Sequence, residues 1–217
     1  MNARRIPDAT VDRLPVYLRV LLDLAASGQP TVSSDQLAEL AGVNAAKVRK
    51  DLSHLGSYGT RGVGYDVDYL RFEITSRLGL AVESPVVIVG LGNLGSALAS
   101  HAGFRERGFI VAALYDADPA KVGKVVAGVP VRHIDDLGGD SDIAMAIGVI
   151  ATPPSVAQEV ADQLVAAGVS AILNFAPTVI AVPETVALRK VDLSLELQVL
   201  SFYQQRADRD SAGVDSA

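Results

Sequence analysis

Residues 86–95 read VVIVGLGNLG, an apolar run that breaks into the pattern G-x-G-x-x-G and then continues into a helix-like stretch. Gly90 allows a tight turn after the strand, Gly92 lets the backbone approach a pyrophosphate, and Gly95 lets helix and strand pack closely. The amino end of the following helix faces the phosphates, because its first N–H groups have no partner within the helix. The stretch therefore predicts a dinucleotide-binding turn at the start of a Rossmann-like domain.

An acidic residue strengthens this prediction. Asp116 ends a second apolar run, 21 residues after Gly95. A carboxylate at this place accepts hydrogen bonds from the ribose diol of NAD(H) and repels the extra phosphate of NADP(H). A tight strand–helix turn that binds nothing needs the glycines but not the acid, so the spacing favours coenzyme binding. The candidate contacts in this segment are Gly90, Leu91, Gly92, Asn93, Leu94, Gly95 and Asp116.

The composition excludes several classes of protein. The 217 residues are 49% hydrophobic and 20% charged, as in an ordinary globular protein, and the absence of cysteine excludes disulfides and thiolate metal sites. Three histidines, His54, His101 and His133, have no metal-ligand spacing. No apolar run is long enough to cross a membrane, and the first residues lack the apolar core of a signal peptide. We therefore expect a cytoplasmic protein with neither a membrane nor a metal partner.

Charge is unevenly distributed along the chain. The net charge is −6, which argues against a uniformly basic nucleic-acid-binding protein. Residues 1–80 carry +1, however, whereas residues 81–217 carry −7. Only the N-terminal third can therefore approach a phosphate backbone without strong overall repulsion.

The N-terminal third has the pattern of a helix-turn-helix. Ser33 and Gln36 form a capping box that opens one short helix. Asn44 can cap a second helix over residues 45–55. Two short helices that meet in a tight glycine-containing turn are typical of this DNA-binding motif. A glycine-rich stretch at 58–65 follows, and its pattern is that of a hairpin that would serve as a wing.

Basic side chains cluster on the second of these helices. Lys47, Arg49 and Lys50 lie near its start, the part of a recognition helix that faces base edges and phosphates. Arg61 on the wing could reach the adjacent minor groove. Basic residues on an exposed helix often form no more than a solvated face, but here the caps and the wing surround them and favour DNA. The candidate contacts are Asn44, Lys47, Arg49, Lys50, Ser53, His54, Arg61 and Gly62.

After residue 80, apolar strands alternate with helical stretches, which is the pattern of a parallel sheet with crossover helices. The predicted fold class is therefore α/β. An N-terminal winged helix precedes a Rossmann-like doubly wound parallel sheet, and a C-terminal helix follows. We expect strands at 86–89, 109–115, 129–131, 143–151 and 171–174, and helices at 96–107 and 155–167.

The predicted C-terminal helix at 192–206 has apolar residues on two sides. The alternating pattern also fits a strand, but Leu, Glu and Gln favour a helix. Apolar residues on two sides require burial on two sides, so we expect another subunit to cover part of this helix. Residues 207–217 are polar, and we expect them to be disordered. The two stripes consist of Leu193, Leu197 and Leu200, and of Leu195, Val199 and Phe202.

The pattern does not favour redox catalysis. A dehydrogenase needs a general acid or base near the nicotinamide and a domain that holds the substrate, and no substrate domain follows the Rossmann-like segment. We therefore expect a protein that binds the dinucleotide and leaves it unreacted, not an enzyme. Two alternatives stay open: a small NAD-dependent dehydrogenase with an accessory N-terminal domain, and a CoA-binding module. Asp116 argues against CoA, because it would repel the 3′-phosphate on the CoA ribose.

Six short stretches carry a resemblance to a known family. They are RLPVYLR at 13–19, KVRKDLS at 47–53, RGVGYDV at 61–67, GLGNLG at 90–95, NFAP at 174–177 and VDLS at 191–194. In these stretches the chain resembles the Rex family of redox-sensing transcriptional repressors, and the match runs over nearly the whole length.

This resemblance implies a repressor that senses the cellular balance of NADH and NAD+. A homodimer would bind an inverted-repeat operator in double-stranded DNA when NADH is scarce and leave it when NADH binds, with NAD+ bound more weakly. The implied domains are a winged helix at 1–79, a Rossmann-like NAD(H) domain at 80–191 and a swapped dimerisation helix at 192–206. The further implied coenzyme contacts are Tyr115, Thr152, Pro153, Asn174, Ala176, Pro177, Asp192 and Leu193.

Overall fold

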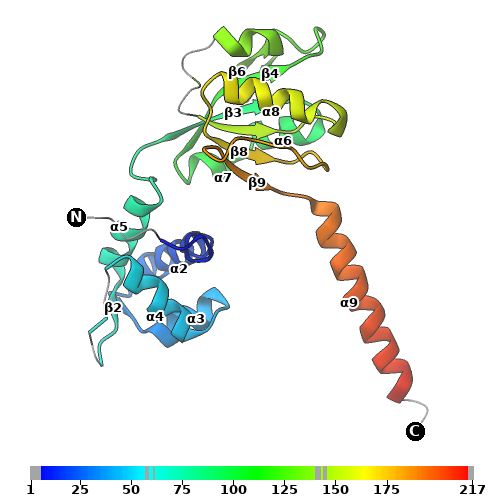
Figure 1. Cartoon of the computed structure of the whole chain (residues 1–217). Coiled ribbons are helices and arrows are strands. Elements are labelled where there is room, and N and C mark those ends of the chain that lie inside the picture. The colour runs from blue at the N-terminus through cyan, green and yellow to red at the C-terminus, as the bar shows by residue number, and fades with distance from the viewer. Residues whose placement is uncertain (1–5, 57–58, 61, 140–142, 144–145, 215–217) are drawn as a thin grey trace. The chain divides into compact units, whose positions relative to one another are not determined.

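The computed structural model describes residues 6–56, 59–60, 62–139, 143 and 146–214, with side chains to residue 206 (Figure 1). Packing within the chain separates two units, Met1–Val82 and Glu83–Ala217. The first has a helical core of its own, and the second is built on a seven-stranded sheet.

The first unit is a cluster of helices with one small antiparallel sheet. Its elements, coloured blue to cyan-green in Figure 1, are α1 (Asp8–Val11), α2 (Leu14–Ala26), β1 (Thr31–Val32), α3 (Ser34–Ala41), α4 (Ala45–His54), β2 (Tyr65–Asp66) and α5 (Val67–Arg77). Apolar residues of α2 and α5 pack together in its core, where Leu21, Leu70 and Ile74 have no exposed surface. Helices α3 and α4 add Leu37, Val48 and further apolar residues to the same core.

Helices α3 and α4 form the predicted helix-turn-helix. The Ser33 hydroxyl accepts the Gln36 N–H at 3.0 Å, and Asn44 Oδ1 accepts the Ala46 N–H at 2.7 Å. Gly42 follows α3 in the left-handed conformation with a φ of 66°, which ends the helix. Both predicted caps are therefore confirmed. The Gln36 side chain, the other half of the predicted capping box, is hydrogen-bonded instead to the side chain of Gln29.

The glycine-rich stretch returns the chain to β2. A bridge joins Thr60 to Gly64, and β2 then pairs antiparallel with β1. Gly64 has a φ of 100°, and a Cβ there would collide with the carbonyl oxygen of Val32, so only glycine fits. The predicted hairpin is therefore present in the described residues, whereas Arg61, the predicted wing contact, lies outside them.

The sheet of the second unit has the strand order β5-β6-β4-β3-β7-β8-β9. The strands are β3 (Ser84–Val89), β4 (Phe109–Asp116), β5 (Val125–Val126), β6 (Val129–His133), β7 (Ile147–Ile150), β8 (Ala171–Asn174) and β9 (Ala187–Lys190). All pairings are parallel except that of β5 with β6. The parallel strands have the doubly wound order of dinucleotide-binding domains, which reverses between β3 and β7. The predicted fold class is confirmed.

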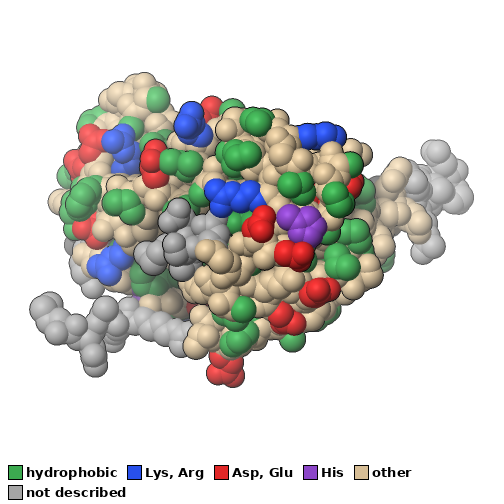
Figure 2. All heavy atoms as spheres, turned by 90° about the horizontal axis from the view of Figure 1, so that it is seen from above, with side chains coloured by type: hydrophobic (Ala, Val, Ile, Leu, Met, Phe, Trp, Pro, Cys, Tyr) green, Lys and Arg blue, Asp and Glu red, His purple; other side chains and the backbone are tan. Residues whose placement is uncertain are grey.

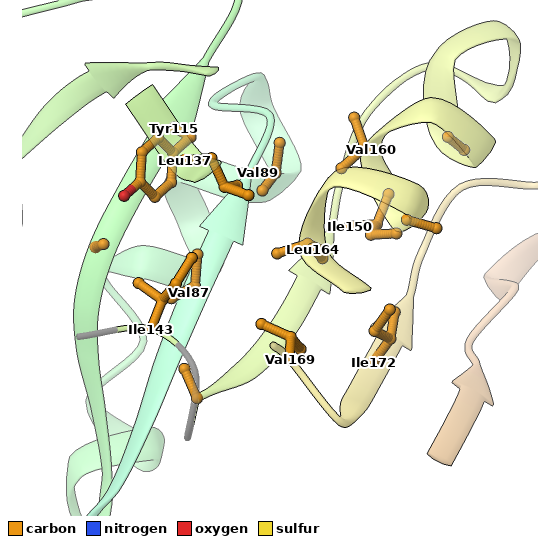
Figure 3. Packing of buried hydrophobic residues seen from close by; sticks show 14 of the residues in the cluster. Val87, Val89, Tyr115, Leu137, Ile143, Ile150, Val160, Leu164, Val169 and Ile172 are labelled. Carbon is orange, nitrogen blue, oxygen red and sulfur yellow. The ribbon is translucent and has the colours of Figure 1, made fainter. Parts of the chain in front are cut away.

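Helical segments cover both faces of this sheet (Figure 1). They are α6 (Asn93–Ala99), α7 (Ala102–Arg105), η1 (Ile134–Gly139), η3 (Pro154–Val156) and α8 (Ala157–Ala166). Alternate residues of β3 point to opposite faces. Val87 and Val89 belong to the core beside α8, which Figure 3 shows from close by. Val86 and Ile88 belong to the other core, together with Ala99 of α6.

Parts of this unit differ from the sequence prediction. The single helix expected at 96–107 is two short helices, because Ser100 ends α6 and His101, in an extended conformation, precedes α7. Strand β7 begins at Ile147, not at residue 143. Strands β5 and β9 were not expected. One has only two residues and the other is an exposed edge strand that ends in two basic residues, so neither has a buried apolar pattern.

Helix α9 (Leu193–Val214) is longer than predicted. The sequence suggests an end near residue 206 and a disordered tail at 207–217, whereas the helix continues to residue 214. No proline interrupts residues 207–214, so the helix can continue through them although Asp208, Asp210, Ser211 and Gly213 are weak helix formers. Within the single chain, the apolar side chains of its first half are exposed: Leu193, Leu195, Leu197, Val199, Leu200, Phe202 and Tyr203.

Candidate coenzyme site and nucleic-acid interface

The carboxyl ends of β3 and β7 flank the turn at Gly90. Its N–H donates to the carbonyl oxygen of Tyr115 at 2.8 Å, and its φ is 96°. A Cβ at Gly90 would lie 2.7 Å from the carbonyl oxygen of Ala151, and one at Gly95 would collide with the carbonyl oxygen of Gly90. Only glycine therefore fits at these two positions of the predicted motif.

Helix α6 begins beside this turn without a side-chain cap. Gly92 is the residue before the helix, and a Cβ there would meet nothing within 4 Å. The first N–H groups of α6, beginning with those of Asn93 and Leu94, have no acceptor within the helix. Backbone donors beside open space are what a pyrophosphate requires. The local geometry at these three residues therefore fits the predicted phosphate contact.

The Asp116 carboxylate lies beside the turn and is already hydrogen-bonded. Oδ1 accepts the Asp118 N–H at 2.8 Å, and Oδ2 accepts the Leu91 N–H at 2.6 Å and Lys121 Nζ at 2.9 Å. Burial raises the pKa of this carboxyl, but the donors from Asp118, Lys121 and Leu91 more than compensate, and the pKa is lowered. The carboxylate is therefore ionised at neutral pH and ties the glycine turn to the end of β4.

Lys121 is a candidate site residue that the sequence pattern does not reveal. From sequence it is an ordinary surface lysine, but its Nζ pairs with the Asp116 carboxylate while 34% of its side chain stays exposed. An ammonium group has three N–H donors, so the Lys121 side chain can bond to Asp116 and to a ribose oxygen together. The only local signal is the Asp118-Pro119 pair, which starts the turn that brings Lys121 back toward β4.

The side chain of Tyr115, which the family resemblance implies as a coenzyme contact, is part of the core. Its side chain has no exposed surface and belongs to the same cluster as Leu137 and Val89, beside which it lies in Figure 3. The strand alternation of β4 turns this side chain toward the core on the α8 side. Its contribution to the turn is the carbonyl oxygen that accepts the Gly90 N–H.

Thr152 follows the end of β7 and carries a hydroxyl that finds no acceptor or donor in the described part of the chain. Its Oγ1 is buried, and its methyl carbon lies 2.8 Å from the place of a Cβ on Gly90. Buried hydroxyls usually have a partner, so this one points to a ligand group or a water. Together with the glycine turn, it fits a bound dinucleotide. Pro153, the next residue, is exposed.

Asn174 shapes the loop after β8. Its Oδ1 accepts the Ala176 N–H at 2.9 Å, and its Nδ2 donates to the carbonyl oxygen of Thr178 at 3.2 Å. Asn174 and Ala176 are both 1% exposed, whereas Pro177 is exposed. The first two residues therefore support the loop from inside, and Pro177 is the member of this predicted group that can touch a ligand.

Asp192 and Leu193 lie where β9 passes into α9. Asp192 Oδ1 accepts the Ser194 N–H at 3.1 Å, and its Oδ2 pairs with Lys190 Nζ at 3.4 Å. Leu193 is 63% exposed. Strands β7 and β8 separate β9 from β3, so a single chain does not bring these two residues to its own glycine turn.

Helix α4 carries the predicted basic residues on its exposed side. Lys47, Arg49 and Lys50 are all exposed. Arg49 Nη1 donates to Ser34 Oγ on α3 at 2.8 Å, which holds the guanidinium beside the start of that helix. Asn44 is engaged as the cap of α4. The helix-turn-helix therefore offers cations and two helix amino ends on the same motif, the combination that contacts a phosphate backbone.

The side chains of the other predicted DNA contacts on α4 are engaged within the protein or partly buried. The Ser53 hydroxyl donates to the carbonyl oxygen of Lys50 at 2.7 Å. His54 is half-buried, and its Nε2 is a buried atom for which the described residues provide no hydrogen-bond partner. Gly62 is exposed with a φ of 81°. Lys47, Arg49 and Lys50 are therefore the strongest candidates on α4.

Other kinds of site find little support in the described residues. Acidic and basic side chains are mixed, with apolar ones between them, on the face shown in Figure 2. None of the described helices is both long enough and apolar enough to cross a membrane. In the same part of the chain, no group of three or more His, Asp or Glu side chains could hold a metal ion.

Two family models match the chain. Residues 5–53 match "Putative DNA-binding protein N-terminus", and residues 82–178 match "CoA binding domain". The two matches correspond to the two units of the structure. They define the class of protein: a DNA-binding domain joined to a nucleotide-binding domain.

Similar proteins identify the family within this class. A redox-sensing transcriptional repressor Rex from Streptomyces griseus is 62% identical over 216 residues, which are 99% of this chain and 85% of the relative. The crystal structure of RSP in complex with beta-NAD+ and operator DNA matches with a TM-score of 0.88 at 33% identity, covering 98% of this chain and 99% of its own. RSP in complex with beta-NADH matches with a TM-score of 0.83 at 33% identity, covering 95% and 98%. The chain belongs to the Rex family of redox-sensing transcriptional repressors, as its sequence motifs predict.

Proposed function

We propose that this protein is a transcriptional repressor that binds operator DNA and leaves it when NADH binds. One observation carries the proposal: the same chain holds a helix-turn-helix with exposed basic residues on α4 and a glycine turn beside the ionised Asp116. The coenzyme is then a signal and not a reactant, so we propose no enzyme activity. A DNA partner also supports a cytoplasmic location.

The glycine turn and its neighbours would hold the dinucleotide. The backbone from Gly92 to Leu94 would bind the pyrophosphate, and Asp116 with Lys121 would bind the adenosine ribose. An ionised carboxylate accepts hydrogen bonds from ribose hydroxyls and repels a phosphate at the same place, which supports NAD(H) over NADP(H). The match to "CoA binding domain" makes CoA the second candidate, but the charge of Asp116 opposes its 3′-phosphate as well.

The difference in affinity between NADH and NAD+ would depend on the apolar side chains around the nicotinamide ring. The nicotinamide ring supplies the signal, because it is neutral in NADH and cationic in NAD+. Leu193, exposed in the single chain, would approach this ring in the partner subunit. Burying a cation against an apolar side chain is unfavourable, so NAD+ would bind more weakly. A difference of about 10²–10⁴-fold corresponds to about 3–5.5 kcal/mol.

A homodimer would cover the exposed apolar residues of α9. An inverted-repeat operator requires two recognition helices at a fixed spacing, which a dimer with two-fold symmetry provides. Deleting residues 192–217 is expected to give a monomer or an aggregate in sedimentation experiments, because the partner surfaces lose their cover. A truncated protein that stays a soluble dimer and still releases DNA with NADH would contradict this role of α9.

Gel shifts on an inverted-repeat duplex test the DNA side of the proposal. Lys47→Ala and Arg49→Ala are expected to weaken binding and to reduce the slope of log K against log salt by about one unit per lost phosphate contact. Lys124→Ala, a matched change of an exposed lysine in the second unit, should alter neither quantity. If both α4 variants kept the affinity and the salt slope of the unmodified protein, α4 would not be the DNA-binding helix.

A further inference from the structure

The carboxylate of Asp51 joins α4 to the first two helices of the chain. Thr10 Oγ1 and Arg13 Nη2 donate to its Oδ1, both at 2.8 Å. Arg13 Nε donates to Oδ2 at 2.6 Å, and the Tyr17 hydroxyl donates to the same oxygen at 2.8 Å. Only 2% of the Asp51 side chain is exposed. We call these four residues the Asp51 network: Thr10, Arg13, Tyr17 and Asp51.

The Asp51 network is saturated. An ionised carboxylate has about four acceptor positions, and here each oxygen receives two donors. Burial raises the pKa of Asp51, but Arg13, Tyr17 and Thr10 more than compensate, so the pKa is lowered. The Arg13 guanidinium binds both oxygens in the bidentate manner that fixes orientation as well as distance.

A contribution to folding stability does not by itself explain why the Asp51 network is present. Buried ion pairs stabilise a fold no better than well-packed apolar side chains of similar volume, although breaking one is strongly destabilising. Val48 and Leu52, which flank Asp51 on the buried side of α4, already provide apolar packing. What hydrogen bonds add is direction, because they weaken steeply when their angles change.

The direction that the network fixes is the rotation of α4 about its own axis. Apolar contacts allow a helix to roll by small amounts, whereas four directed bonds from α1, from α2 and from Arg13, the residue that precedes α2, do not. Lys47 precedes Asp51 by one helical turn and Lys50 is its neighbour in the chain, so a roll of α4 displaces the ends of these long side chains. Base recognition requires side chains at hydrogen-bond distance from base edges, whereas phosphate contacts by flexible lysines tolerate small displacements.

We propose that Asp51 is a positioning residue for sequence-specific DNA recognition, which acts by holding α4 at a fixed rotation against α1 and α2. The inference rests on the proposed DNA binding by α4. It assigns no DNA contact to Asp51, Thr10 or Tyr17. It predicts that weakening the Asp51 network reduces discrimination between the operator and other DNA, while the electrostatic part of binding is kept.

Two mild variants of the full-length protein test this proposal. Tyr17→Phe and Thr10→Val each remove one donor and leave the Arg13–Asp51 pair in place. Affinity is measured for an inverted-repeat duplex selected from a random pool by the unmodified protein, and for an unrelated duplex of equal length at the same salt concentration. We expect the affinity for the selected duplex to fall about fivefold for each variant, the value of one net hydrogen bond, with unchanged affinity for the unrelated duplex and an unchanged salt slope.

Tyr69→Phe is the matched control, because Tyr69 is 50% exposed on α5 and lies outside the Asp51 network. It should leave the ratio of the two affinities unchanged. If the two network variants bind both duplexes less well and in the same proportion, the network only maintains the fold, and the positioning role is wrong. Unchanged affinity for the selected duplex would overturn it equally. If the unmodified protein selects no duplex from the pool, the proposed DNA binding fails as well.

Discussion

Asp51 and Asp116 are both buried aspartates that pair with one basic side chain, but they are held by different kinds of donor. All donors to Asp51 are side chains, and they lie 34 to 41 residues away in the sequence. Two of the donors to Asp116 are backbone N–H groups, from Leu91 in the glycine turn and from Asp118. The first carboxylate fixes helices against each other, and the second ties the glycine turn to the loop after β4.

The comparison shows that a lowered pKa does not by itself distinguish a structural carboxylate from a binding one. In both cases burial raises the pKa, and hydrogen bonds lower it by more. The difference lies in the surroundings. The glycine turn that Asp116 holds has open space beside Gly92, and next to Gly90 lies Thr152, whose hydroxyl has no partner among the described residues. Asp51 is instead enclosed by the side chains that bind it.

The largest expected effect is a loss of folding stability when Asp51 is replaced. Asp51→Asn removes the buried negative charge and replaces one of the two acceptor oxygens with an NH2 donor that faces other donors. It should therefore lower the free energy of unfolding of the first unit by about 3–5 kcal/mol. Urea unfolding followed by circular dichroism measures this change, and NADH binding by the second unit should persist. Asp68→Asn, at an ion pair whose aspartate is 82% exposed, is the control and should change stability little. An unchanged urea midpoint for Asp51→Asn would contradict the structural role.

Alkaline pH should also affect the first unit through its tyrosine donor. Burial, followed by the hydrogen bond to Asp51, raises the pKa of Tyr17 from 10.0 to about 12. Unfolded tyrosine loses its proton above pH 10.0, whereas folded Tyr17 keeps it until about pH 12, so the free energy of unfolding falls between these values. Burial raises the pKa of Tyr65 as well. The test is therefore the difference between the unmodified protein and Tyr17→Phe, which should lose less stability over this range. Equal pH dependence would show that Tyr17 titrates alike in both states.

Asp116→Ala should act on ligand binding. Hydrogen bonds to a charged group contribute about 1.5–3 kcal/mol, so we expect NADH affinity to fall by about ten- to a hundredfold. Operator binding without NADH should be unchanged, because the first unit is not altered. Isothermal titration calorimetry measures the first quantity and gel shifts the second. Asp136→Ala, at an exposed aspartate of η1, is the control. Loss of DNA binding in Asp116→Ala alone would mean that Asp116 supports the fold and not the ligand.

The smallest effect is expected from Lys121→Ala. Without the ammonium group the pKa of Asp116 should rise, because Lys121 is one of the groups that lower it. The affinity for NADH should fall only about fivefold, the value of one hydrogen bond. Affinity for NADPH should fall by a larger factor, since Lys121 offsets part of the repulsion between Asp116 and a 2′-phosphate. Calorimetric titration measures the affinity of the variant for both coenzymes. Tighter NADPH binding by the variant would contradict the proposed role of Lys121.

Features that depend on neighbouring residues could be predicted from the sequence. The caps at Ser33 and Asn44 and the turn at Gly90 require only a few consecutive residues of the correct type, and all three are present. The doubly wound parallel sheet followed from the alternation of apolar strands and helical segments. The family could be recognised because several such motifs occur together in one chain.

The rest depends on contacts between distant parts of the chain or on weak local signals. The bonds of Asp51 to Thr10 and Tyr17 cross 41 and 34 residues, and no spacing rule predicts them. Tyr115 was expected beside the coenzyme, but the alternation of β4 turns its side chain into the core. The break at His101 falls inside the expected helix, and α9 continues into a polar segment; neither place has a proline that would mark a helix end in the sequence.

We propose that NADH binding at Asp116 releases operator DNA from α4. The fluorescence anisotropy of a labelled inverted-repeat duplex bound to the protein, measured during titration with NADH, NAD+ and NADPH, tests this release. We predict that NADH releases the duplex at the lowest concentration, that NAD+ requires about a hundredfold more, and that Asp116→Ala retains the duplex at NADH concentrations that free it from the unmodified protein. Release by NADPH at the same concentration as by NADH, or equal release from Asp116→Ala, would contradict the claim.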